Sequence, residues 1–221
     1  MALELYIISG SPHAWAVMLG METKGLKYTV RRLDPSKKEH KTDAYFALNP
    51  HGKVPTLKHD DTIIYESIAI LAYIDQLSPK DSLFGVTPQK TGLIWQRVFE
   101  LTNYLRAPLI DDAARPIFQG RFTDNPSEIR ETSINAHTAL AWAEDILSTS
   151  PYLAGNEISA ADIVLIPYLN SFLRAAGKPS AKLLGEAFLP LESSFPNLAA
   201  WAARIEAMPG YTQAYPPHWR D

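Results

Sequence analysis

The first third of the chain alternates between strand-like and helix-like patterns of apolar residues. "ELYIIS" and "KYTVRRL" predict two strands, and the stretch from Pro12 to about Lys24 predicts a helix between them. A short helix over roughly residues 42–48 follows, and "VPTLKHDDTIIYE" then predicts two short strands that turn at Asp60 and Asp61. "SIAILAYIDQL" predicts a closing helix. The predicted order is βαβαββα, a mixed four-stranded sheet whose first two strands are parallel and whose last two are antiparallel.

The pattern changes after residue 78. "SPKDSLFGVTPQK" combines prolines, a glycine and mixed charges, which is typical of a linker, and we place that linker at residues 79–90. Only helical periodicity follows, with helices predicted over residues 91–119 (bent near Pro108), 127–148, the apolar "SAADIVLIPYLNSFLRAAG", 181–188 and 196–207. We therefore predict an α/β domain over residues 1–78 and an all-α domain over residues 91–221.

Composition narrows the functional classes. The 221 residues are 46% hydrophobic and 20% charged with a net charge of −3, so neither a nucleic-acid surface nor an anionic membrane surface is expected. No apolar run approaches the ~18 residues of a membrane span, and no leader pattern precedes the first strand, so we expect a cytoplasmic protein. The six histidines are scattered and the chain has no cysteine. We expect no metal site, and any sulfur chemistry has to come from a ligand.

Ser11 stands at the mouth of the first predicted helix, in "SGSPHAWAVML". Serine is a favoured N-cap and proline is favoured at the next position, so Ser11 is explained by capping alone. The same hydroxyl at a helix N-terminus is also suited to stabilising an anion. The residue pattern leaves both interpretations open.

Four blocks of the chain, in this order, resemble the cytosolic glutathione transferase family: "LYIISGSPHAWAVML", "LNPHGKVPTL", "YESIAILAYI" and "LAGNEISAADIVLIPYL". The resemblance covers essentially the whole chain, and "SPHAW" is similar to the serine pattern of the zeta, phi and tau groups. It implies a thioredoxin-like domain that binds glutathione as co-substrate and a helical domain that contributes the electrophile pocket. It also implies a homodimer that acts in detoxification and uses no metal.

The resemblance assigns roles to individual residues. Ser11 would stabilise the glutathione thiolate, Glu66 would take the ammonium group, and Ser67 at a helix start would take the neighbouring carboxylate. The remaining residues implied for glutathione are Val54 through its backbone, a cis Pro55, and Lys53, His40 and Lys41 near the glycyl carboxylate. The residues implied for the electrophile pocket are Pro12, His13, Tyr104, Pro108, Asp111 and Phe118.

Several alternatives remain open. Ser9 is a second candidate donor, and the tail "YPPHWRD" is a candidate cover for the pocket. His51 departs from the aromatic residue that locks the dimer in several subfamilies. The same scaffold and the same Ser11 would also serve a glutathione-dependent isomerase, an ether-cleaving enzyme or a peroxidase. A non-enzymatic binding module would be expected to lack Ser11, Glu66 or Ser67, and all three are present.

Overall fold

The computed structural model describes residues 2–122 and 125–220, and the chain divides into two compact units. Unit 1 combines Met1–Phe84 with Met208–Asp221, and unit 2 is Gly85–Ala207. None of the helices in the described ranges is both long and apolar enough to cross a membrane.

Unit 1 is built on a four-stranded sheet with the order β2-β1-β3-β4. Its strands are β1 (Leu3–Ile7), β2 (Thr29–Arg32), β3 (Thr56–His59) and β4 (Thr62–Tyr65). β1 runs parallel to β2 and antiparallel to β3, and β3 pairs antiparallel with β4 across the turn at Asp60 and Asp61. The predicted mixed sheet and hairpin are therefore confirmed.

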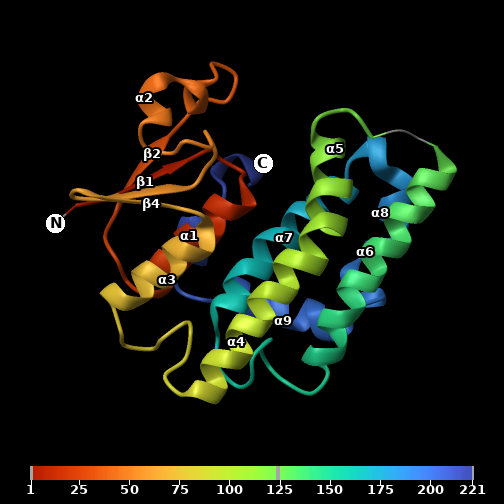
Figure 1. Cartoon of the computed structure of the whole chain (residues 1–221). Coiled ribbons are helices and arrows are strands. Elements are labelled where there is room, and N and C mark those ends of the chain that lie inside the picture. The colour runs from red at the N-terminus through yellow and green to blue at the C-terminus, as the bar shows by residue number, and fades with distance from the viewer. Residues whose placement is uncertain (1, 123–124, 221) are drawn as a thin grey trace. The chain divides into compact units, whose positions relative to one another are not determined.

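Three helices complete the thioredoxin-like arrangement of unit 1. These are α1 (Pro12–Thr23), α2 (Asp43–Phe46) and α3 (Ser67–Leu77). α1 and α3 pack side by side against one face of the sheet, and α2 lies on the opposite side (Figure 1). Leu5, Leu57 and Ile70 are fully buried between these layers, as expected for the inward positions of strands and helix.

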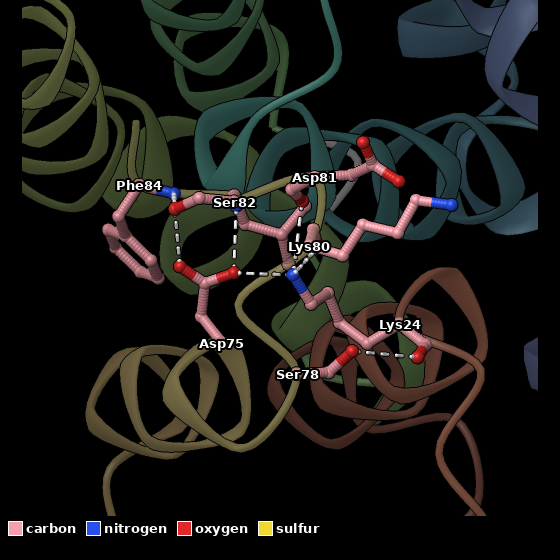
Figure 2. A network of polar contacts seen from close by, with 8 residues as sticks. Lys24, Asp75, Ser78, Lys80, Asp81, Ser82 and Phe84 are labelled. Carbon is pink, nitrogen blue, oxygen red and sulfur yellow. Dashed lines mark hydrogen bonds and ion pairs between the residues drawn. The ribbon is translucent and has the colours of Figure 1, made fainter. Parts of the chain in front are cut away.

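The loop after α3 belongs to unit 1, because a buried ion pair holds it there. The Lys24 Nζ lies 2.9 Å from Asp75 Oδ1, and both side chains are 1% exposed. The same ammonium donates to the carbonyls of Lys80 at 2.6 Å and Asp81 at 3.0 Å, while Ser82 Oγ donates to Asp75 at 2.7 Å (Figure 2). The first unit thus extends to Phe84, six residues beyond the boundary we expected at residue 78.

The end of the chain also belongs to unit 1. α10 (Tyr211–Ala214) and the 3-10 turn Pro217–Trp219 pack on α1 (Figure 1), where Trp15 is surrounded by Tyr211, Tyr215 and Trp219. We had expected the helical domain to run to residue 221. The difference arises because the aromatic side chains of the tail find their apolar partner on α1.

Unit 2 contains no strand in its described residues, only an isolated bridge between Tyr152 and Gly155, which confirms the all-α class. Its α-helices are α4 (Pro88–Glu100), α5 (Arg115–Phe118), α6 (Pro126–Leu147), α7 (Ala160–Ala176), α8 (Lys182–Phe188) and α9 (Pro196–Glu206). α4 begins inside the segment we expected to be a linker. Between α4 and α5 the helix continues through π-helical stretches, Leu101–Leu105 and Ala107–Ala114. Pro108, which lacks an N–H, lies in the second stretch.

A capping box formed by Ser159 and Asp162 lies at the start of α7. Asp162 accepts hydrogen bonds from the backbone and hydroxyl of Ser159 and, on its other oxygen, from Leu153 N and Trp201 Nε1 at 3.0 and 2.9 Å. Burial raises the pKa of Asp162, and these hydrogen bonds oppose that rise. The box anchors a helix that is buried nearly all round, as its apolar sequence predicts.

Candidate functional site

Strand register brings three separate segments of unit 1 to one end of the sheet. Tyr6 near the end of β1 pairs with Thr56 at the start of β3, and Thr56 pairs with Tyr65 at the end of β4. The turn after β1, the residues before β3 and the residues after β4 therefore meet. These are the segments that carry Ser11, Val54 with Pro55, and Glu66 with Ser67.

Ser11 is the N-cap residue of α1, so the predicted capping role of this serine is confirmed. The Ala14 N–H donates to Ser11 Oγ at 3.4 Å, which is a long and weak hydrogen bond. Ser11 N donates to Ile8 O at 3.1 Å, and the side chain is half-buried. The hydroxyl therefore keeps its own proton available for a second partner.

The second candidate donor, Ser9, is engaged elsewhere. Ser9 Oγ lies 3.0 Å from His218 Nδ1, on the tail of the chain. This contact favours Ser11 over Ser9 as the hydroxyl that faces a ligand.

Residues 51–55 form a braced loop. Tyr45 Oη and Asn49 Nδ2 both donate to Lys53 O at 2.8 Å, and Val54–Pro55 is a cis peptide bond, as the resemblance implied. Burial raises the pKa of Tyr45, although its hydrogen bond with Thr56 opposes the rise. No described residue hydrogen bonds to the backbone N–H or C=O of Val54. The loop therefore presents a free backbone edge of the kind that an extended peptide pairs with.

The start of α3 differs from a simple serine cap. Glu66 is the N-cap residue, with φ of +72° and no side-chain capping bond, and Ser67 is the first helical residue. A positive φ is uncommon for a residue other than glycine and costs roughly 1–3 kcal/mol. Ser67 Oγ lies 3.4 Å from His13 Nδ1 in the first turn of α1. The N-termini of α1 and α3 therefore meet, and each favours a negative charge.

His40 and Lys41 have different surroundings. The Lys41 Nζ donates to Gly52 O at 2.8 Å, so this ammonium braces the loop. Gly52 has φ of +55°, and an added Cβ there would lie 2.7 Å from Phe46 Cε1 and 2.9 Å from His40 O. The Nδ1 of His40 is buried and has no hydrogen-bond partner among the described residues. His40 and Lys41, whose ammonium has three N–H donors, thus both remain candidate ligand contacts, together with the exposed Lys53.

The candidate pocket residues of unit 2 have different surroundings. Tyr104 and Pro108 line a cavity of about 350 Å³ together with Trp142. Asp111 is held between Arg106 and Arg115, with N–O distances of 3.3 and 2.7 Å, and Phe118 lies under the ammonium of Lys178 at 5.5 Å. Tyr104 and Pro108 thus share a cavity within unit 2, whereas Asp111 and Phe118 are held by the ionic and cation–π contacts just described.

Tyr45 and Asn49 were not among the residues we predicted from the sequence. Asn49 is only 2% exposed, and its amide also donates to Thr56 Oγ1 at 3.2 Å. Both residues act on the Lys53–Pro55 segment through its backbone carbonyl. The sequence signal was the "LNPHG" turn, in which asparagine precedes a proline and a glycine.

The fold and this end of the sheet define a thioredoxin-like unit with anion-favouring helix ends, carried in one chain with a helical unit. Comparisons with known proteins agree. The family described as "Glutathione S-transferase, N-terminal domain" matches residues 1–76, and "Glutathione S-transferase, C-terminal domain" matches residues 128–204. Glutathione S-transferase theta-1 of Bos taurus is 32% identical over 218 residues, covering 95% of this chain and 85% of the relative.

Two further relatives extend the agreement over the whole chain. Glutathione S-transferase A of Pleuronectes platessa is 28% identical over 96% of this chain and 91% of its own length. The crystal structure of a glutathione S-transferase from the Antarctic clam Laternula elliptica is similar with a TM-score of 0.84 at 26% identity, covering 100% of this chain and 95% of that one. The chain belongs to the glutathione S-transferase family.

Proposed function

We propose that this protein binds glutathione at the end of the sheet where α1 and α3 begin, and that it transfers the thiolate to an electrophilic small molecule. The observation that carries the proposal is the contact between Ser67 and His13, 3.4 Å apart, which brings the two helix N-termini together beside Ser11. The N-terminus of α3 then favours the carboxylate of glutathione, and the N-terminus of α1 favours its thiolate. The free backbone of Val54 lies at the same end of the sheet.

Each part of glutathione meets a matching group in this proposal. Glu66 takes the ammonium group, and Ser67 with the free N–H groups of α3 takes the adjacent carboxylate. The backbone of Val54 pairs with the cysteinyl unit as an added strand would. Lys53 supplies charge for the glycyl carboxylate, and the buried Nδ1 of His40, protonated, would donate to it.

Ser11 holds the thiolate by a hydrogen bond, and no general base is needed. A free thiol has a pKa of about 8.5, and each unit lowered needs ~1.36 kcal/mol, so reaching neutrality needs ~2–3 kcal/mol. A hydrogen bond to a charged group contributes ~1.5–3 kcal/mol and a helix N-terminus ~0.3–2 kcal/mol. The thiol proton leaves to solvent. The thiolate sulfur then forms a bond to an electrophilic carbon, and the leaving group on that carbon departs with the electron pair of the bond that breaks.

The acceptor is a small hydrophobic electrophile. In unit 1, Pro12 and His13 follow Ser11 directly on α1 and are candidates to contact this electrophile. In unit 2, Tyr104 and Pro108 line a cavity of their own and are candidates by that observation. Asp111 and Phe118, held by ion-pair and cation–π contacts, are candidates for shaping the pocket wall. A panel of an aryl halide, a hydroperoxide, a maleyl compound and an aryl ether separates a transferase from a peroxidase, an isomerase and an ether-cleaving enzyme.

We expect Ser67→Ala to weaken glutathione binding by about 1–3 kcal/mol, because a bound carboxylate loses a hydroxyl donor. Glu66→Ala should weaken binding as well, since the ammonium group loses its partner. Calorimetry with glutathione measures both effects, and Asp43→Ala on the short α2 is a control on the same unit. Wild-type affinity in both variants would refute the proposed site.

We also propose a two-fold dimer that uses α3 and the helix after residue 90. His51 lies against Tyr65 of its own chain, with ring centroids 5.6 Å apart, so the proposed dimer does not depend on an aromatic lock at this position. Light scattering at micromolar concentration should give twice the mass of one chain, and His51→Ala should leave that value unchanged. A monomer at this concentration would contradict the proposal.

We place this enzyme in the cytoplasm, where the glutathione pool is kept reduced and thiolate chemistry is supported. Among the described residues, no three His, Asp or Glu side chains lie close enough together to hold a metal ion.

A further inference from the structure

The tail of the chain lies against the turn that presents Ser11. His218 Nδ1 is 3.0 Å from Ser9 Oγ, although the two residues are 209 positions apart. Gly10 lies between Ser9 and Ser11 with φ of +85°, and a Cβ added there would lie 3.2 Å from His218 Nε2 and 3.4 Å from Trp219 Nε1. The tail therefore approaches the backbone of this turn so closely that, with a side chain at position 10, His218 would have to shift by a few tenths of an ångström.

The tail is anchored independently of His218. Trp15 is 2% exposed, and the rings of Tyr211, Tyr215 and Trp219 contact it edge-on with centroid separations of 5.9, 5.2 and 5.6 Å. These separations lie in the favourable range for aromatic pairs. The aromatic anchor fixes the segment, while the imidazole of His218 is an exposed group at its tip.

The packing between the tail and the turn is nearly complete. The cavity that remains there has a volume of about 10 Å³ and is lined by residues of both segments, among them Ser9, Gly10, Ser11, Trp15, Pro216 and Pro217. A space of that size holds about one water molecule. The turn has little room to shift while the tail is in place.

We propose that His218 is a positioning residue for Ser11: by holding Ser9 and packing against Gly10, it fixes the turn from which the Ser11 hydroxyl reaches the glutathione sulfur. The inference rests on the proposed function and deepens it. A glycine at position 10 makes this turn conformationally permissive, so an external restraint is needed to aim the hydroxyl. Hydrogen bonds to a reacting group lose strength when the donor is displaced by about half an ångström.

The test compares His218→Phe, which keeps a ring but removes the nitrogen, with His218→Asn, which keeps a polar atom near the position of Nδ1. His218→Phe should raise the pKa of the bound glutathione thiol by about 0.3–1 unit and lower kcat about two- to tenfold, the equivalent of one neutral hydrogen bond. The KM for glutathione should change by less than about twofold, because Ser67 and Glu66 are untouched. His218→Asn should restore most of the loss.

Two further variants separate positioning from general loosening. Ser9→Ala removes the same hydrogen bond from the other side, and the double variant Ser9→Ala/His218→Phe should be no worse than the stronger single variant. Gln213→Ala, an exposed change on α10, is the matched control and should leave the thiol pKa unchanged. Urea midpoints measured in parallel report any loss of folding.

Several outcomes would overturn the inference. An unchanged thiol pKa in His218→Phe, or equal effects of His218→Phe and Gln213→Ala, would remove the positioning role while leaving the proposed function intact. Fully additive losses in the double variant would show that His218 does not act through Ser9. A wild-type protein that binds glutathione without lowering its thiol pKa would refute the role of Ser11 itself.

Discussion

Replacing Ser11 with alanine is expected to raise the pKa of the bound glutathione thiol by about 1–2 units, because the thiolate loses a hydrogen bond of ~1.5–3 kcal/mol. Turnover at neutral pH should fall by a similar factor, about ten- to a hundredfold. Glutathione affinity should change less, since the hydrogen bond matters mainly to the ionised form. Thiolate absorbance followed against pH measures the shift directly.

The alternative for Ser11 makes a different prediction. If Ser11 only caps α1, replacing it should lower the free energy of unfolding by ~0.5–2 kcal/mol. We expect a value at the low end of this range, because the capping hydrogen bond is 3.4 Å long. In that case the thiol titration in Ser11→Ala would match that of the wild type. Ser11→Cys is a useful companion, because a protein thiol at this position is expected to shift activity towards thiol transfer through a mixed disulfide.

Replacing Lys24 with methionine is expected to destabilise unit 1 by about 3–5 kcal/mol, because it leaves the carboxylate of Asp75 buried without its cation. The carbonyls of Lys80 and Asp81 lose their donor in the same change, so residues 80–84 should detach (Figure 2). Urea unfolding measures the loss. Lys27→Met, at an exposed position three residues away, should have almost no effect.

The double variant Lys24→Met/Asp75→Leu sharpens this test. Replacing both charges with apolar groups of similar size is often nearly neutral, so the double variant should recover much of the stability lost in Lys24→Met. Equal losses in Lys24→Met and Lys27→Met would show that the ion pair contributes nothing beyond a surface charge.

The same ion pair has a defined dependence on pH. Burial opposes ionisation of Asp75, but hydrogen bonds from Ser82, Leu83 and Lys24, together with the charge of Lys24, hold its pKa below the ordinary value. A lowered carboxyl pKa contributes stability that is complete above the unfolded-state pKa of about 3.9 and is lost as the pH falls through the folded-state value. The stability difference between wild type and Lys24→Met should therefore be largest near neutral pH and shrink in acid.

Local periodicity was sufficient to predict most of the fold. Alternating residues marked β3 and β4, and the paired aspartates between them marked the turn, because both signals lie within a dozen residues. The limits of unit 1 were not predictable in this way, because they depend on contacts of Lys24 with residues more than 50 positions away.

The motifs of the candidate site were predicted from the sequence. The residues that hold those motifs in place were not. The cis bond before Pro55 followed from the family resemblance alone, since few X–Pro bonds are cis. Lys41 was expected to meet a ligand carboxylate, and its ammonium also donates to Gly52 O, a partner that composition does not reveal. Tyr45 and Asn49 act through a backbone carbonyl, and backbone contacts leave little trace in side-chain patterns.

Because Tyr211, Tyr215 and Trp219 cover Trp15, the first unit is assembled from both ends of the chain. A growing polypeptide on the ribosome therefore leaves Trp15 without these three rings until residues 211–219 have been made. At about 5–20 residues per second, synthesis of the intervening helical unit takes on the order of ten seconds. Throughout that time the helix that begins after Ser11 is without its aromatic cover, so folding of the first unit cannot be completed before the helical unit has been synthesised.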